Sequence, residues 1–394
     1  MKKHLLVRVF VGFVVLFFAG LACVQAQGKE EPIRLGILTD YTGFIADYGP
    51  KWRVLQDMYL DEIGYKIAGK PIKLFIEDSG SKPDMSLEKA KKLVGVDKVH
   101  MLVGTILGTN TLTVAPYAAE VKIPHIIWYT GHYEAVERGW SFATTPPAET
   151  STYIAGKYAY DKGYRTATCI GQDYVAGHKF NGGAMQAFID KGGKIIQKQW
   201  APLGTKDFAP YLTAMKHADV CFFWLAGVTT VTFWKQYAEY GLLDKMPLVM
   251  TEGDTLFEPW LREVDPRLVG RVSGRTSYTS DIDTPASRKF VAAFRAKTGF
   301  DPDAYDLAAY ETMMLAIKAF ERTKGDTNPE KLRQAIRGLK LETPSGVVRI
   351  SPEGFAFRTS YTFELAKKDE RIVRKRIGQY PEQELIRLRP GIAP

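Results

Sequence analysis

Short apolar runs alternate with amphipathic stretches along most of the chain. The apolar run at 33–38 is typical of a buried strand, and the stretch 48–63 carries apolar side chains at helical spacing. The same alternation predicts strands at 71–77, 99–104 and 124–129, and helices at 84–94 and 110–121. Because strands that alternate with helices form parallel sheets through right-handed crossovers, this first unit is predicted to be a doubly wound α/β sheet.

The pattern starts again after Thr144-Thr145-Pro146-Pro147. Strands are expected at 166–171, 194–200, 220–225 and 247–251, with helices at 151–162, 178–191, 208–217 and 231–240. The second of these helices is followed by Gly192-Gly193, a common signal for a helix end. A second doubly wound unit of similar size is therefore predicted.

Two further helices, at 287–298 and 304–323, exceed what the second sheet needs to cover its faces. We expect them to cross back onto the first unit, and we expect the strand-like runs at 346–350 and 360–365 to return to the second. The predicted fold is α/β, with two doubly wound parallel-sheet lobes joined by a multi-strand hinge. Lobe 1 is expected to comprise 27–144 plus 279–346, and lobe 2 to comprise 145–278 plus 347–394. Ligands of such sheets bind at the carboxyl ends of the strands, which here face a cleft between the lobes.

The first 26 residues have the pattern of an export signal. Basic residues precede an apolar run at 9–22, and Val24-Gln25-Ala26 offers small residues where a signal peptidase reads them. The apolar run of ~14 residues is shorter than the ~20 that a membrane-spanning helix needs. We expect an exported protein that begins near Gln27, with an uncleaved anchor or a lipid on Cys23 as alternatives.

Composition narrows the class of protein. The 394 residues are 45% hydrophobic and 25% charged and include three Cys, which indicates a folded protein of two or three domains rather than a disulfide scaffold. The net charge is +9, but basic and acidic residues alternate after the N-terminal segment, so no nucleic-acid partner is indicated. Cys169 and Cys221 lie in strand-like runs, either as two small buried residues or as a disulfide.

Motifs for catalysis and for nucleotide binding are absent from the sequence. There is no G-x-S-x-G elbow, no P-loop, no G-x-G-x-x-G after a strand and no H-E-x-x-H pair. Four aspartates that follow predicted strands are interpreted as turn or cap residues: Asp40, Asp78, Asp173 and Asp254. His125 lies in a predicted strand and is interpreted as structural. The sequence therefore predicts no cofactor, no metal site and no catalytic residue, and it favours a protein that is not an enzyme.

Several segments follow one another in the order and spacing of one protein family. They are Ile33-Arg34-Leu35-Gly36-Ile37, Thr42-Gly43 with Tyr48-Gly49, Glu77-Asp78, Val103-Gly104, Val121-Lys122-Ile123-Pro124, Phe142-Ala143-Thr144-Thr145-Pro146, Tyr240-Gly241-Leu242 and Ala304-Tyr305. With them the chain resembles the type I periplasmic substrate-binding proteins of ABC importers, the leucine/isoleucine/valine-binding family. The resemblance implies the two-lobed fold and a location in the periplasm.

The resemblance also implies where a ligand is held. In amino-acid binders of the family, backbone N–H groups and hydroxyls at a helix N-terminus hold the carboxylate, and Gly108, Thr109 and Thr130 match those places. An aromatic side chain in the first loop forms one wall of the site, and Tyr48 matches it. An acid after a second-lobe strand meets the ligand ammonium, and Glu252 matches that position.

Departures from the family pattern widen the choice of ligand. The stretch 128–133 reads Trp-Tyr-Thr-Gly-His-Tyr, so Tyr129 and His132 are expected to add rings and a hydrogen-bonding group to the first-lobe wall. Ala176 stands where many members have a tyrosine, and Tyr174 is expected to replace that wall. The first lobe is thus expected to gain rings and the second to lose them. Rings stack on flat ligands, which makes an aromatic acid a candidate beside an amino acid.

The sequence therefore predicts an exported solute receptor of an ABC importer. Its expected partners are a small-molecule ligand, either an amino acid or an aromatic carboxylate, and the permease of the importer. The ligand is expected to bind between the lobes and to stabilise a hinge-closed form. Two alternatives stay open, namely a ligand-sensing domain of a signalling receptor and an exported enzyme on the same scaffold.

Overall fold

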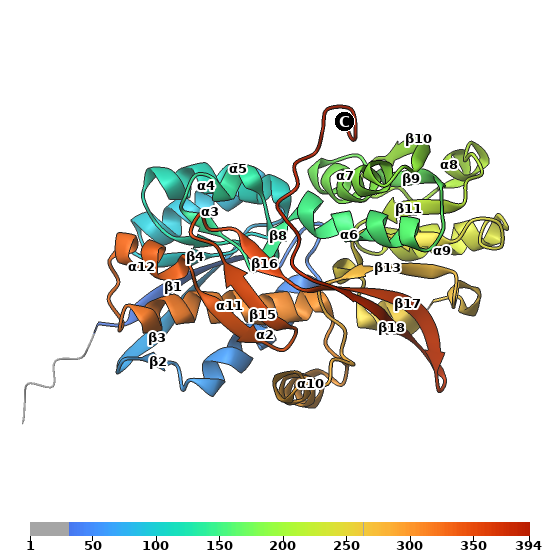
Figure 1. Ribbon diagram of the computed structural model, residues 1–394. Coiled ribbons are helices and arrows are strands. Elements are labelled where there is room, and N and C mark those ends of the chain that lie inside the picture. The colour runs from blue at the N-terminus through green and yellow to red at the C-terminus, as the bar shows by residue number, and fades with distance from the viewer. Residues whose placement is uncertain (1–30, 263) are drawn as a thin grey trace, which may run out of the picture.

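Two lobes lie side by side in the protein, joined by strands that pass between them (Figure 1). The structure is a computed structural model that describes residues 31–262 and 264–394. The predicted export signal at 1–26, with Cys23 and the expected start near Gln27, lies outside the described residues. Each lobe has a twisted sheet at its centre with helices on both faces, as the alternation of strands and helices predicted.

The lobe 1 sheet has the strand order β2-β3-β1-β4-β5-β7. Its strands are β1 (Ile33–Thr39), β2 (Lys66–Ile67), β3 (Lys70–Asp78), β4 (Met101–Val103), β5 (His125–Ile126) and β7 (Ser141–Phe142). Neighbouring strands are parallel except β2 and β3, which form a hairpin. His125 is fully buried between β4 and β7, where its Nδ1 lies 3.0 Å from the Ser141 hydroxyl.

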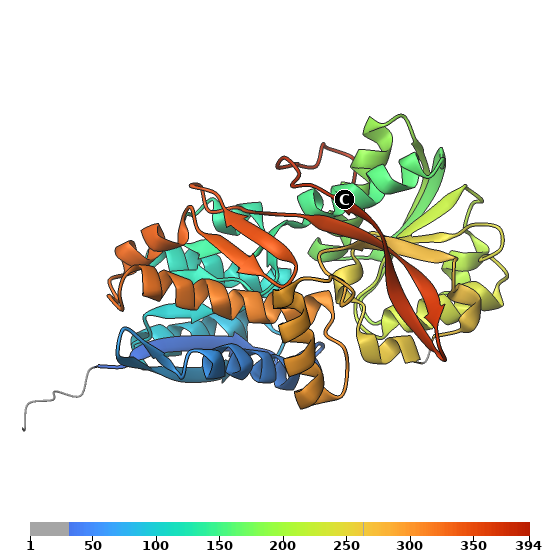
Figure 2. The same cartoon turned by 60° about the horizontal axis from the view of Figure 1, so that its bottom comes forward.

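Helices cover both faces of the lobe 1 sheet. α3 (Pro83–Gly95) and α4 (Gly108–Glu120) lie on one face, and α2 (Tyr48–Glu62) and α11 (Ala304–Arg322) lie on the other. The alternation of side chains along β1 explains this, because Leu35 and Ile37 are buried with α2 and α11 while Leu38 packs with α3 and α4. α10 (Pro285–Thr298) packs beside α2 (Figure 2). The late helices thus lie on lobe 1, although the second sheet precedes them in the chain.

The lobe 2 sheet has the strand order β10-β9-β11-β12-β13-β17-β18. Its strands are β9 (Thr166–Gln172), β10 (Lys194–Ala201), β11 (Val220–Trp224), β12 (Leu248–Met250), β13 (Val272–Thr276), β17 (Ser360–Lys368) and β18 (Arg371–Tyr380). The first five in this order are parallel, and β17 and β18 are added antiparallel. α6 (Ala148–Asp161) and α7 (Val175–Asp190) cover one face, and α8 (Ala209–Thr213) and α9 (Thr229–Glu239) cover the other. Short 3-10 helices at Gly253–Thr255, Glu258–Arg262 and Pro266–Leu268 complete the lobe.

The two described cysteines are free and buried. Cys169 on β9 packs in the cluster under α6 and α7, whereas Cys221 on β11 packs on the opposite face of the sheet. The register explains the separation, because Cys169 is opposite Phe222 and successive side chains of a strand point to opposite faces. Of the two alternatives left by the sequence, the structure therefore has two small buried residues rather than a disulfide.

One strand in the C-terminal part of the chain joins a different sheet from the one expected. The strand at 346–350 was expected to belong to lobe 2, but β15 (Gly346–Ile350) pairs with β14 (Lys340–Thr343) and β16 (Ala356–Arg358) in a small separate sheet. That sheet lies beside α11, and α12 (Pro329–Ile336) precedes it. The physical reason is local, since a short turn lets β14 and β15 form a hairpin whose Leu341, Val348 and Ile350 are all buried. The return to the lobe 2 sheet begins with β17.

A buried ion pair holds two of the passages between the lobes together. Arg358, at the end of β16, donates to both carboxylate oxygens of Glu311 on α11, at 2.8 and 3.2 Å. The same guanidinium donates to the carbonyl oxygen of Thr144, at 3.4 Å, just before β8 (Thr145–Pro147) carries the chain into lobe 2. Arg358 and Glu311 are both buried, so the loss of either partner would leave an uncompensated charge at a cost of about 3–5 kcal/mol.

Helices α6 and α7 pack unusually closely in lobe 2. A Cβ on Gly156 of α6 would lie 2.0 Å from the carbonyl oxygen of Ala184 on α7. A Cβ on Gly183 of α7 would lie 2.2 Å from the carbonyl oxygen of Glu149 on α6. Glycine is therefore required at both positions, because any side chain would push one helix backbone away from the other.

Gly156→Ala is expected to lower the free energy of unfolding by about 1–3 kcal/mol, because the added methyl group must displace the backbone of α7. Urea unfolding measures this change. Gly95→Ala is the matched control, since Gly95 is exposed at the end of α3 and nothing lies within 4 Å of the new Cβ. The control is expected to keep or gain stability, by about 0.5–1 kcal/mol. Equal stability of both variants would contradict the close helix contact.

Candidate ligand-binding site

A cavity lies between the two lobes and is lined by side chains from both. It measures about 600 Å³ when its opening to solvent is included. Aromatic side chains dominate the wall: Phe44, Tyr48, Tyr129 and Tyr305 from lobe 1, and Tyr174, Phe180 and Trp224 from lobe 2. Three ring side chains therefore come from lobe 2, which contributes nearly as many rings to the wall as lobe 1 does.

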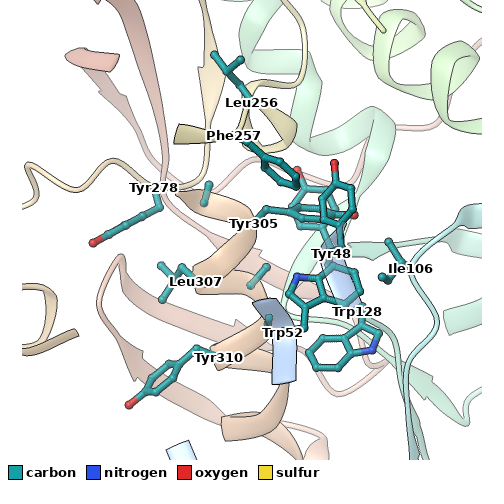
Figure 3. Close-up of a cluster of buried hydrophobic side chains, with 14 of the residues drawn as sticks. Tyr48, Trp52, Ile106, Trp128, Leu256, Phe257, Tyr278, Tyr305, Leu307 and Tyr310 are labelled. Atoms are coloured by element: carbon teal, nitrogen blue, oxygen red, sulfur yellow. The ribbon is translucent and has the colours of Figure 1, made fainter. Parts of the chain in front are cut away.

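Contacts between rings fix the lobe 1 wall (Figure 3). Tyr48, at the start of α2, packs edge-on against Tyr305 of α11 with ring centres 5.0 Å apart, and Tyr305 packs likewise against Tyr129 at 4.7 Å. Tyr48 also meets Phe257 of lobe 2, with ring centres 4.2 Å apart. Edge-to-face pairs of this kind add about 0.5–1.5 kcal/mol to the burial of the rings. The wall is thus preformed from three separate segments of the chain.

Tyr129 is held in a special backbone conformation. Its φ of 65° lies in the left-handed region, which non-glycine residues rarely adopt. Its carbonyl oxygen accepts a hydrogen bond from the Thr145 hydroxyl, and its own hydroxyl donates to Asp254 of lobe 2 at 2.9 Å. Strained backbone of this kind persists only where the surroundings enforce it, and it concentrates at functional sites.

His132 presents a neutral imidazole at the cavity wall. The side chain is 3% exposed and follows β6 (Thr130–Gly131), directly before the short helix α5 (Tyr133–Val136). Burial, together with the nearby charge of Lys179, lowers the pKa of His132 to about 4, so the ring is uncharged at neutral pH. Its Nδ1 is buried and has no hydrogen-bond partner among the described residues.

The N-terminus of α4 faces the same corner of the cavity. Leu107 and Gly108, the first residues of this end, both line the cavity, and α4 has no side-chain cap. A Cβ on Gly108 would lie 2.9 Å from Cε1 of His132, so only glycine leaves room for the imidazole. The first N–H groups of a helix lack internal partners and favour negative charge. A neutral ring donor and a helix N-terminus thus converge here, a combination suited to a carboxylate.

The lobe 2 wall comes from strand ends and from the start of α7. Tyr174 precedes α7, and its ring lies 5.9 Å from the ring of Trp224 at the end of β11. Trp224 also meets Phe180 of α7 at 4.9 Å, and its indole N–H donates to the hydroxyl of Thr255 at 3.1 Å. Burial raises the pKa of Tyr174, which keeps its phenol protonated.

Glu252 does not line the cavity. Its carboxylate is fully buried and accepts hydrogen bonds from a single guanidinium nitrogen of Arg275, at 2.6 and 2.7 Å. Burial raises the pKa of Glu252 to about 7, and the charge of Asp254 adds to the rise while that of Arg275 opposes it. The predicted contact with a ligand ammonium has no support in this geometry, because the carboxylate lies outside the cavity wall and both of its oxygens are occupied by Arg275.

Asp254 joins the two lobes, although the sequence pattern indicated only a turn or cap residue. The side chain is fully buried and accepts hydrogen bonds from Tyr129, from Arg275 at 3.1 Å, from Thr276 at 2.7 Å and from Ser277 at 2.6 Å. Burial alone would raise the pKa of Asp254, but Arg275 and the hydrogen bonds outweigh it and lower the pKa. Asp254 is therefore an ionised acceptor that holds the hydroxyl of a lobe 1 ring.

The structure thus brings together five of the eight residues expected at the site: Tyr48, Gly108, Tyr129, His132 and Tyr174. Thr109 is half-buried outside the wall, with its hydroxyl 3.4 Å from Asn110, and Thr130 lies in β6. Trp224 and Tyr305 were missed as wall residues. The position of Trp224 at the carboxyl end of a predicted strand was a signal that could have found it.

The described residues contain neither a membrane-spanning helix nor a cluster of metal-binding side chains. No helix between residues 31 and 394, residue 263 aside, is long and apolar enough to cross a membrane. In the same part of the chain, no group of His, Cys, Asp and Glu side chains is arranged to hold a metal ion.

Comparisons with known proteins agree with this architecture. The family model described as periplasmic binding protein matches residues 32–370. The Leu/Ile/Val-binding protein homolog 6 of Brucella melitensis is 27% identical over 364 residues, which cover 89% of this chain and 92% of the relative.

Solved structures extend the match to the fold as a whole. A solute binding protein of an ABC transporter from Rhodopseudomonas palustris HaA2, in complex with p-hydroxybenzoic acid, is 27% identical with a TM-score of 0.84 and covers 90% of this chain and 98% of its own. Another, from Rhodopseudomonas palustris BisB5 in complex with 3,4-dihydroxybenzoic acid, is 25% identical with a TM-score of 0.84 and covers 90% and 99%. The chain therefore belongs to the periplasmic binding protein family and is a solute receptor of an ABC importer.

Proposed function

We propose that this receptor binds an aromatic carboxylic acid of the hydroxybenzoate type. The observation that carries the proposal is the interlobe cavity, whose wall is built from aromatic rings and contains no Asp, Glu, Lys or Arg among the described residues. A flat ring between rings gains both burial and stacking energy. A buried charge is costly unless it is paired or hydrogen-bonded. A wall without charged side chains therefore favours a ligand with a single charged group that hydrogen-bond donors of the site can hold.

The carboxylate of the ligand is proposed to bind at the start of α4. There Leu107 and Gly108 line the cavity at the helix N-terminus, and a Cβ on Gly108 would lie 3.1 Å from Nε2 of His132, so this ring nitrogen lies beside the same terminus. Backbone N–H groups at a helix N-terminus bind anions without a formal positive charge. His132, held neutral by burial, can supply one ring N–H as a further donor.

An amino acid is the second candidate, favoured by the name of the Brucella relative and by a Leu-, Ile-, Val-, Thr- and Ala-binding protein of Pseudomonas aeruginosa that is 23% identical. An α-amino acid brings an ammonium group, which needs an anionic partner in a dry site. Glu252 is the acid expected in that role, and it is already paired with Arg275. This pairing supports the aromatic acid over the amino acid.

Closure of the lobes is proposed to trap the ligand. Tyr129 and Tyr48 of lobe 1 contact Asp254 and Phe257 of lobe 2 directly around the cavity. A ligand that touches both walls adds to these contacts, so it shifts the population toward the closed form by its differential affinity. The closed receptor is proposed to deliver its ligand to the importer's permease at the periplasmic side of the membrane, and no catalytic step is assigned to it.

4-Hydroxybenzoate and 3,4-dihydroxybenzoate are expected to raise the melting temperature of the chain from residue 27 on, whereas leucine and valine are expected to leave it unchanged. A ligand at 100 times its dissociation constant adds about 2.7 kcal/mol of stability. A thermal-shift panel of these compounds, with benzoate and phenylalanine, measures the effect. A shift with phenylalanine and leucine but with no benzoate would contradict the proposal.

Tyr129→Phe is expected to weaken 4-hydroxybenzoate binding by about tenfold, because it removes one hydrogen bond to an ionised carboxylate while the ring remains. Titration followed by tryptophan fluorescence measures the dissociation constant, since Trp224 lines the cavity. Tyr65→Phe is the matched control: its hydroxyl donates to Asp57 at 2.7 Å within lobe 1, and neither residue lines the cavity. Equal dissociation constants for the two variants would show that the Tyr129–Asp254 bond does not support closure.

A further inference from the structure

The last residues of the chain form an extended segment, 381–394, that follows β18 and lies along the boundary between the lobes (Figure 1). We call it the strap. It is fastened to lobe 2 through α7, where the Gln186 amide donates to the carbonyl oxygen of Arg387 at 3.0 Å and accepts from the N–H of Arg389 at 2.8 Å. Lys198 of β10 donates to the carbonyl oxygens of Gly391 and Ile392, at 2.6 and 2.8 Å.

The strap also contacts lobe 1, through α5. The guanidinium of Arg387 pairs with the carboxylate of Glu137, and it lies over the ring of Tyr133, 4.1 Å from the ring centre. The hydroxyl of Tyr133 donates to the carbonyl oxygen of Ile386 at 3.0 Å. One short run of the strap therefore has partners on both lobes.

The helix that receives the strap is directly connected to the cavity wall. α5 begins with Tyr133, and the preceding residue, His132, lines the cavity. A second interlobe pair reaches the same helix, because Lys179 of α7 contacts both carboxylate oxygens of Glu134 at 2.8 Å. The contacts between α5 and lobe 2 therefore lie next to His132, in the part of the cavity wall that belongs to lobe 1.

We propose that the strap fastens the closed form of the receptor and that Arg387 is a positioning residue that sets ligand affinity. A segment anchored on lobe 2 keeps its contacts to α5 only while lobe 1 stays close. Contacts that exist only in the closed form shift the open–closed equilibrium, and the apparent dissociation constant changes by the same factor. Because Arg387 and Glu137 are about half exposed, their share of the effect falls as salt screens the pair.

The test compares two arginines of the strap in the full chain. Arg387→Ala removes a contact to lobe 1, whereas Arg389→Ala, the matched control, removes a pair with Asp190 that lies wholly within lobe 2. Arg387→Lys keeps the charge and serves as the rescue variant. The probe ligand is 4-hydroxybenzoate, titrated at low and at high salt, and spin labels on the two lobes report the open fraction without ligand and at saturation.

Arg387→Ala is expected to raise the dissociation constant about three- to tenfold at low salt through a faster off-rate, and less at high salt. Arg389→Ala is expected to stay within about twofold of the unmodified chain, and Arg387→Lys to recover part of the loss. Equal constants for the two alanine variants would overturn the proposal. The affinity readout rests on the proposed function, so if 4-hydroxybenzoate does not bind, that function fails and the spin labels decide alone. A larger open fraction for Arg387→Ala than for Arg389→Ala then supports the strap, and equal fractions overturn it.

Discussion

The side chain of Arg275 lies at the end of β13, fully buried, where the chain leaves lobe 2 for lobe 1. A guanidinium in this place requires negative partners, and Glu252 and Asp254 supply them. Two consequences follow. Glu252 is withdrawn from the cavity, and Asp254 is fixed as an ionised acceptor for Tyr129 of the opposite lobe. The chemistry of the ligand site and the contact between the lobes therefore both depend on this cluster of buried charges.

The cavity wall also depends on the buried charges of Arg275, Glu252 and Asp254, because Tyr129 connects the two. Tyr129 contributes its ring to the cavity and its hydroxyl to Asp254, so it acts as wall and as interlobe contact together. Tyr305, from the helix that crosses back after lobe 2, packs between Tyr129 and Tyr48. The rings are held in place by packing against one another, and no Asp, Glu, Lys or Arg among the described residues lines the cavity. A carboxylate can instead rely on a helix N-terminus and a neutral imidazole.

Local signals in the sequence were sufficient for the scaffold. Periodicity predicted both sheets, and the surplus of late helices indicated that the chain crosses back. β18 was not predicted, and β15 joins a different sheet from the one expected. An apolar strand carries no mark of the sheet that it joins, and the hairpin of β15 with β14 was decided by a turn and by burial. The resemblance to the family implied Tyr48 and Gly108 at the site, and the unusual stretch 128–133 indicated His132, and all three line the cavity. Loops that follow parallel strands meet at one edge of a sheet, which brings such residues together.

The partners of buried charges could not be predicted in this way. Glu252 and Arg275 are 23 residues apart, and Asp254 and Tyr129 are 125 apart, so no local pattern joins either pair. The sequence by itself determined two doubly wound lobes, their hinge and the loops that face the cleft, because these follow from the alternation of apolar and polar positions. Only the tertiary structure decided that Glu252 faces Arg275 rather than the cavity, because a side chain's electrostatic role depends on groups brought near it by the fold.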